Sequence, residues 1–449
     1  MIIKMKTEIS ISEHFGYKKL LRFTFPSIVM MIVTSIYSVV DGLFVSNYVG
    51  LTPFAAVNLI MPFLMILGSA GFMFGTGGSA LVAKTMGEGN KERANSIFSL
   101  LVYSAAAVGV IFAVLGIIFL RPISAFLGAE GELLENCVLY GSIYLSAMPF
   151  FILQYEFQSF FITAEKPRLG LLVTAAAGAA NIILDALFVA VFKWGLVGAA
   201  LATAVSVFVG GVAPIIYFAR ENTSLFRLGK TKFDIKALFK TCVNGSSELM
   251  SNISISIVSM LYNFRLNSYA GENGIAAYGV MMYVNMIFFA AFVGYSVGTA
   301  PVISYHYGAQ NKDELKSILK KSSVVISVFS VSMLVLAQVL AVPLAQMFTG
   351  YDRDLMELTV NGFRIFSISF LFAGIAVFGS SFFTALNDGL TSALISFLRT
   401  LVFQVAAVII LPILFGINGV WSSIAAAELV AAIVTVSFIF GKRKKYGYL

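Results

Sequence analysis

Repeated apolar runs constrain this chain more than any other feature of its sequence. Runs of about 20 or more predominantly apolar residues, enough for one helical crossing of a bilayer, recur along all 449 positions. Only 12% of the residues are charged, whereas soluble domains average about 25%. The alternation of polar and apolar residues that a membrane β-barrel needs is absent. The sequence therefore predicts an all-α polytopic membrane protein.

Twelve transmembrane helices are predicted, separated by short loops rich in Gly, Pro, Asn and charged residues. They cover residues 20–46, 53–82, 95–119, 137–163, 168–191, 196–219, 239–265, 274–303, 318–347, 356–384, 388–414 and 418–440. Lys and Arg favour cytoplasmic segments. Most of the 30 basic residues lie in the termini, including Lys4 and Lys6, and in alternate loops, whereas the other loops contain only Arg121, Lys193, Arg265 and Arg353. We therefore expect a multi-pass protein of the cell (inner or plasma) membrane with both termini in the cytoplasm.

The two halves of the sequence repeat at an offset of 221 residues. Tyr48 and Gly50, for example, correspond to Tyr269 and Gly271. Each unit has an even number of predicted spans, so both units should have the same orientation and be related by a pseudo-two-fold axis along the membrane normal.

The repeat predicts two parallel six-helix lobes. The expected boundaries are 1–219 for the N-terminal lobe, 220–240 for a basic cytoplasmic linker and 241–449 for the C-terminal lobe. Rocking of two such lobes around a central cavity is typical of transporters.

The first predicted span contains two unusual residues, Pro26 and Asp41. Pro26 cannot donate a backbone hydrogen bond and should bend the helix, which makes it a candidate hinge. A carboxylate in hydrocarbon is costly and is by default a candidate functional group. At 1.5 Å per residue, Asp41, Asn181, Asp185 and Thr203 all lie at a depth of about 10–14 Å below the outer surface.

These four residues form an oxygen-rich set that suits a small cation such as Na⁺. Alternatively, two close carboxylates in a low dielectric can share one proton, which would make the pair a proton carrier. A third interpretation is that Asp185 and Asn181 only hydrogen-bond a neighbouring helix. The second lobe lacks the set, because the corresponding residues are Tyr262, Val402, Ala406 and Ile424.

The C-terminal lobe has its own intramembrane charges. Glu248 lies in the seventh span, and Arg399 and Glu428 lie near mid-membrane in the eleventh and twelfth. Arg399 and Glu428 can pair, either as a structural ion pair or as part of substrate binding. Glu156, near the cytoplasmic end of the fourth span, is expected to pack locally or to extend toward the membrane surface.

Several functional classes are disfavoured. The chain has no GxxxxGK[ST] phosphate loop, so no ATP drive is expected, and no catalytic triad or zinc-ligand spacing points to an enzyme. The net charge of +8 is explained by topology, so nucleic acid is not an expected partner. Cys137 and Cys242 fall near opposite membrane faces, so no disulfide is expected. No cofactor is expected beyond a coupling ion.

The chain resembles the multidrug and toxic compound extrusion (MATE) family, in its bacterial and archaeal branch, over nearly its whole length. The stretches that carry the resemblance are VVDGLFVSNYVG around Asp41, GEGNKERA after the second span, TAEKPRLG before the fifth, NIILDALFV within it and GLVGAALAT in the sixth. The resemblance implies a monomeric antiporter that exports amphipathic, often cationic drugs or metabolites, driven by inward Na⁺ or H⁺ through alternating access. It also implies a cation site at Asp41, Asn181, Asp185 and Thr203, with bending at Pro26.

Two alternatives stay open at this point. The first is a lipid-linked oligosaccharide flippase of the same superfamily, although such proteins often have more than twelve spans and a strongly basic cavity. Here only Arg364 and Arg399 are intramembrane cations, away from the ends of the spans. The second is a channel or receptor without coupled transport.

Overall fold

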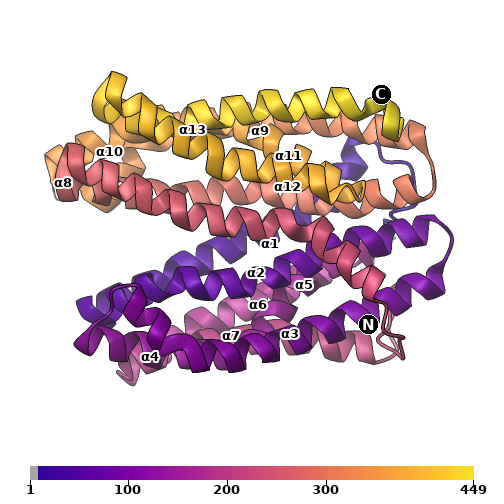
Figure 1. Cartoon of the computed structure of the whole chain (residues 1–449), viewed down its shortest axis with the longest axis horizontal. Coiled ribbons are helices and arrows are strands. Elements are labelled where there is room, and N and C mark those ends of the chain that lie inside the picture. The colour runs from indigo at the N-terminus through magenta and orange to yellow at the C-terminus, as the bar shows by residue number, and fades with distance from the viewer. Residues whose placement is uncertain (1–8, 351, 449) are drawn as a thin grey trace, which may run out of the picture.

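The computed structural model describes residues 9–350 and 352–448, and this part of the chain is built of helices joined by turns, with a longer non-helical segment at 220–234 (Figure 1). Lys4 and Lys6, counted above among the cytoplasmic basic residues, lie outside the described residues. In chain order the elements are α1 (Tyr17–Phe44), η1 (Val45–Val49), α2 (Leu51–Gly87), α3 (Lys91–Phe126), α4 (Gly131–Ser146), α5 (Met148–Thr163), α6 (Pro167–Asp185), η2 (Ala186–Val191), α7 (Gly195–Ala219), α8 (Ile235–Gly308), α9 (Lys312–Thr349), α10 (Arg353–Phe366), η3 (Ser367–Ser369), α11 (Phe370–Ala385), α12 (Gly389–Phe397), η4 (Leu398–Val402) and α13 (Phe403–Tyr446). Three of the short elements, η1, η2 and η4, are π-helical, and η3 is a 3₁₀ turn.

The described helices confirm the prediction of an all-α polytopic membrane protein. Nine of them are long and apolar enough to cross a membrane, or ten if α4 and α5, which meet at 55°, are one span. Two of the long helices are kinked, α8 at Gly271 and α13 at Gly416, close to where the sequence separates spans 7 from 8 and 11 from 12. The part of α8 before Gly271 is less apolar, because Asn and Ser recur along it.

The repeat is visible in the backbone. Gly50 and its counterpart Gly271 have φ of 115° and 56°, and Gly195 and its counterpart Gly416 have φ of 59° and 56°. Side chains with a Cβ rarely adopt these conformations, so glycine is needed where one helix gives way to the next. Equivalent glycines therefore end equivalent spans in the two halves.

The helices gather into two bundles that lie side by side, and the first and last described residues, which we call the termini, lie at the same end of the molecule (Figure 1). We call α1–α7 the first half and α8–α13 the second half. Each half has a buried apolar core of its own, around Phe98, Phe157 and Phe218 in the first and around Phe292, Phe382 and Trp421 in the second. The thiols of Cys137 and Cys242 are free.

The two halves approach most closely through glycines toward the end that contains the termini. A Cβ on Gly77 of α2 would lie 2.3 Å from the backbone oxygen of Thr241, and one on Gly87 would lie 2.0 Å from that of Tyr305. Both partners belong to α8. The halves are therefore packed backbone against backbone at this end, which is closed in this conformation.

Candidate functional site

The first candidate site begins at Asp41, three residues before the end of α1. Thr203, in α7, donates a hydrogen bond from Oγ1 to Oδ1 of Asp41 at 3.4 Å. Asn181 and Asp185 lie one turn apart on α6, which places both side chains on one face of that helix. Both side chains lie within interaction distance of Asp41. The structure therefore brings together the four residues that the sequence grouped by depth.

Three oxygens of this set, all on α6, lack hydrogen-bond donors among the described residues. Asn181 and Asp185 are 1% and 0% exposed. Neither carboxylate oxygen of Asp185, nor the amide oxygen of Asn181, accepts a hydrogen bond from any described residue. Buried polar atoms without partners are costly, and an ionised carboxylate is the costliest of them. A bound cation or proton would remove that cost, so the residues present fit a small cation held by oxygen atoms.

This site does not resemble a transition-metal centre. Within the described residues, no group of three or more His, Cys, Asp or Glu side chains is arranged to hold a metal ion. The candidate set has two carboxylates, and its other oxygens come from an amide and a hydroxyl. Such neutral oxygen ligands suit hard monovalent or divalent cations rather than zinc or copper.

Each of the three π-helical turns lies near or contains a charged residue of a candidate site. Among the described residues, η1 begins four positions after Asp41, η2 begins directly after Asp185, and η4 contains Arg399. A π-helical turn inserts an extra residue into the helical ladder and is frequent at functional sites. No local sequence pattern announces these turns, so sequence reasoning missed them.

Three further polar residues surround the carboxylates and were not predicted. Tyr37 precedes Asp41 by one helical turn, and its hydroxyl accepts a hydrogen bond from Nε2 of Gln154, in α5, at 3.3 Å. Tyr140, on α4, faces both Asp41 and Asp185, and its hydroxyl is buried without a partner among the described residues. The spacing of Tyr37 from Asp41 could have found the first of these, but nothing in the sequence places α4 and α5 beside α1.

Pro26 lies inside α1, which continues through it from Tyr17 to Phe44. The next two residues pack against the second half, because a Cβ on Gly294 of α8 would lie 2.5 Å from Cα of Ile28 and 2.8 Å from the carbonyl oxygen of Ser27. Pro26 is therefore at the interface between the halves, and its role as a hinge stays a prediction.

The second candidate site is a cavity of about 340 Å³, lined mostly by the second half with a few residues of α2 and α5. Its charged lining residues are Glu248, Arg399 and Glu428. Nε of Arg399 donates to both carboxylate oxygens of Glu428, at 2.8 and 3.0 Å, and the guanidinium lies 4.9 Å from the ring centroid of Phe289. The structure thus pairs the two charges that the sequence placed at one depth.

Glu248 adds a second carboxyl group to the cavity lining. Its carboxyl group is close enough to Arg399 for an electrostatic interaction, but the guanidinium forms its ion pair with Glu428. With all three groups ionised, the lining has two carboxylates for one cation. None of the four residues of the Asp41 set lines this cavity, so the two candidate sites are separate.

Glu156 does not extend to the membrane surface. It is 0% exposed, and neither of its carboxylate oxygens has a hydrogen-bond partner among the described residues. Gly75 of α2 explains the burial, because a Cβ there would lie 3.1 Å from Cα of Glu156. The helices pack too closely for a side chain at this position to reach solvent.

Comparison with known proteins is consistent with this architecture. A family model described as MatE matches residues 26–187 and 249–410, once in each half. The chain is 26% identical to the multidrug export protein MepA of Staphylococcus haemolyticus (strain JCSC1435), over 96% of this chain and 94% of that protein. It is 24% identical to MepA of Staphylococcus aureus (strain MSSA476), over 94% of this chain and 93% of that protein.

Solved structures with the same fold include an outward-facing conformation of a multidrug resistance MATE family transporter of the MOP superfamily. That structure superposes with a TM-score of 0.92 at 22% identity, covering 100% of both chains. A crystal structure of a MATE P26A mutant superposes with a TM-score of 0.90 at 22% identity, covering 98% of both chains.

Proposed function

This chain belongs to the MatE family, and from that premise we propose that it is a cation-coupled antiporter that exports amphipathic, often cationic drugs or metabolites by alternating access. It is a transporter rather than an enzyme. The relatives named above as multidrug export proteins support the class of cargo. We further propose that it acts as a monomer in the cell membrane, with the end that contains both termini in the cytoplasm.

The observation that carries the coupling proposal is that three buried oxygens of Asn181 and Asp185 accept no hydrogen bond from the described residues. Asp185 and Asn181 are buried with unsatisfied oxygens, and Asp41 faces them with Thr203 as a hydrogen-bond donor. Among the described residues, neither carboxylate forms an ion pair with Lys or Arg, so an incoming Na⁺ or H⁺ would supply the missing positive charge. Asp41, Asn181, Asp185 and Thr203 would hold that ion, which is cargo of the cycle rather than a resident cofactor.

The cavity supports the class of substrate. Its charged lining carries more carboxylates than cations, and its walls include the aromatic rings of Phe72, Tyr278, Phe289 and Phe370. Aromatic faces and carboxylates together attract cations with an apolar body. A lipid-linked oligosaccharide carries phosphate and would meet two carboxyl groups here and a single guanidinium that is already paired, so the geometry disfavours the flippase alternative.

Helix α1 gives a physical connection between the two sites. Near Asp41 it packs on the first half, where a Cβ on Gly178 of α6 would lie 2.8 Å from Cδ1 of Tyr37. Near Pro26 it packs on α8 of the second half through Ile28 and Gly294. A change of charge at Asp41 therefore acts on a helix that also packs against the second half. We propose Pro26 as the hinge that lets these two parts of α1 move separately.

The coupling proposal is tested by substituting the carboxylate without changing its size. We expect Asp41→Asn and Asp185→Asn to abolish efflux of an amphipathic fluorescent cation such as ethidium from energised cells, because the charge that attracts the coupling ion is lost. Glu132→Gln is the matched control, since Glu132 is an exposed carboxylate in the first turn of α4. Membrane levels of each variant are compared by immunoblot.

The efflux rates of these variants decide whether the carboxylates form a coupling site. Loss of efflux in both Asp variants at normal membrane levels, with the control unchanged, supports the proposed site. Efflux at the parent rate in Asp41→Asn would show that this carboxylate does not couple transport to a cation.

A further inference from the structure

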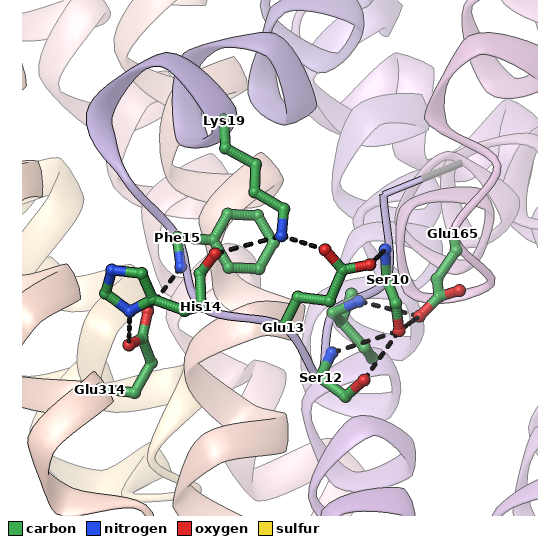
Figure 2. A network of polar contacts seen from close by, with 9 residues as sticks. Ser10, Ser12, Glu13, His14, Phe15, Lys19, Glu165 and Glu314 are labelled. Carbon is green, nitrogen blue, oxygen red and sulfur yellow. Dashed lines mark hydrogen bonds and ion pairs between the residues drawn. The ribbon is translucent and has the colours of Figure 1, made fainter. Parts of the chain in front are cut away.

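A short segment before α1, residues 10–15, runs between the two halves at the end that contains the termini. We call it the strap. Figure 2 shows that its two ends meet different carboxylates, Glu165 at one end and Glu314 at the other. Glu165 lies in the turn between α5 and α6, in the first half, and Glu314 is the third residue of α9, in the second half.

The first-half contact converges on one carboxylate oxygen. Ser10 donates from Oγ to Oε1 of Glu165 at 2.6 Å, and the backbone N–H of Ile11 donates to the same oxygen at 2.8 Å. The Ser10 hydroxyl also meets that of Ser12 at 2.9 Å, so the turn of the strap is organised around Ser10 (Figure 2).

The second-half contact is more extensive. Nδ1 of His14 lies 2.6 Å from Oε2 of Glu314, and the backbone N–H of Phe15 donates to Oε1 at 2.8 Å. Lys321, two turns further along α9, donates to the carbonyl oxygen of Phe15. Glu314 is only 6% exposed, so these hydrogen bonds are shielded from water.

Apolar packing also binds the strap to the second half. Ile11 and Phe15 are 1% and 0% exposed, and both belong to the core cluster that is built mainly from second-half residues. Phe15 meets Phe23 of α1 edge to face, with 5.6 Å between ring centroids. The strap is therefore embedded on one side, and on the other its hydrogen bonds converge on Glu165.

Alternating access, on which this inference rests, requires the halves to separate at the end that is closed here. The strap crosses that separation, so opening must break one of its two contacts. We propose that the strap is a releasable latch that stabilises the closed conformation. Opening detaches Ser10 and Ile11 from Glu165, while the strap stays with the second half through Glu314 and its buried side chains.

The latch predicts which distances change on opening. Spin labels would be placed on a background without the native thiols (Cys137→Ala, Cys242→Ala), at exposed Lys91 of α3 in the first half and exposed Lys320 of α9 in the second. The distance distribution of this pair is measured by double electron–electron resonance in lipid nanodiscs. We expect Ser10→Ala to raise the open-to-closed ratio by about tenfold, because it loses one hydrogen bond to a charged group. Glu314→Ala removes the acceptor of the His14 and Phe15 hydrogen bonds and should raise the ratio too, because the latch needs both of its ends to be held.

Asp313→Ala is the matched control, because Asp313 is an exposed acid that neighbours Glu314 in the first turn of α9. It should leave the distribution unchanged. The double variant Ser10→Ala/Glu165→Ala should add nothing to Glu165→Ala alone, because both remove the same contact. Ser10→Ala removes a single hydroxyl group, so the test survives if a carboxylate variant fails to fold.

A third label at exposed Ser12 tests which contact releases. The Ser12–Lys320 pair should keep one distance in every variant that retains Glu314, whereas the Ser12–Lys91 pair should gain a longer one. Unchanged Lys91–Lys320 distributions in both Ser10→Ala and Glu314→Ala would overturn the latch. A Ser12–Lys320 distance that lengthens while Ser12–Lys91 stays fixed would contradict the proposed direction of release. No substrate or ion gradient is present, so this outcome is independent of whether cation-coupled transport is found.

Discussion

Asp388 anchors the last turns of α13. It lies in the turn before α12, where its side chain accepts a hydrogen bond from the backbone N–H of Thr391 at 3.4 Å. Nζ of Lys442 and the hydroxyl of Tyr446, both near the end of α13, donate to its other oxygen at 2.7 Å each. Burial raises the pKa of Asp388, but the hydrogen bonds from Lys442, Tyr446 and Thr391 outweigh it and hold the pKa at about 2.

This contact predicts a pH dependence of stability. Because the pKa is lower in the folded protein than in the unfolded chain, the stabilisation is present above about pH 4 and is lost as the pH falls through about 2. We expect Asp388→Asn to lower the free energy of unfolding by about 1.5–3 kcal/mol at neutral pH, the usual value of a hydrogen bond to a charged group. The measurement is thermal unfolding in detergent at several pH values.

The exposed acid Asp354, in the first turn of α10, provides the comparison through Asp354→Asn. Equal melting temperatures for Asp388→Asn and the parent at pH 7 would contradict the role assigned to this contact.

Depth along a helix was enough to group the candidate site residues, because the rise per residue of a helix is nearly constant. It placed Asp41 level with Asn181, Asp185 and Thr203, and Arg399 level with Glu428. Depth does not determine which way a side chain points around the helix axis, nor which helices are neighbours in the bundle. Tyr140 and Gln154 were missed for that reason. For Glu156, depth left local packing and extension toward the membrane surface both open, and the structure shows packing.

The helices themselves were largely predictable from hydropathy, and their irregularities were not. The span predicted at 137–163 is two helices, α4 and α5, that meet at 55° around Ala147. Pro149 weakens the ladder there, but it is not the full cause. The 3₁₀ turn η3 (Ser367–Ser369) interrupts the corresponding span of the second half, at the positions equivalent to Ser146–Met148. Both halves therefore have a break at the same position of the repeat, and it becomes visible only when the structures of the two halves are compared.

Close packing of α1 on α8 gives a prediction at the level of the element. Gly294→Ala would place a Cβ 2.5 Å from Cα of Ile28, so the helices must separate. We expect a loss of about 1–3 kcal/mol of stability, as for other overpacked interfaces, seen as a lower melting temperature in detergent.

Gly279→Ala is the matched control on the same helix, because a Cβ there meets nothing within 4 Å. It should leave the melting temperature unchanged or raise it, since Ala favours a helix over Gly by about 1 kcal/mol. If both variants melt at the parent temperature, the two helices are not packed as closely as the structure has them.

At the scale of the whole molecule, the halves share a backbone and differ in chemistry. The donor-free oxygens around Asp185 lie in the first half, whereas most of the cavity wall and its charges lie in the second. Neither site contributes residues to the other. The proposed coupling would therefore pass through movement of the halves, and α1, which contains Asp41, packs against both halves.

The most direct test of coupled export uses purified protein in proteoliposomes. Movement of a fluorescent amphipathic cation against its own gradient is compared under an imposed Na⁺ gradient, an imposed pH gradient and no gradient. We predict uphill movement with at least one of the two ion gradients, opposite in direction to that gradient, and none without a gradient. Equal movement in all three conditions, or movement that only dissipates the substrate gradient, would contradict cation-coupled antiport.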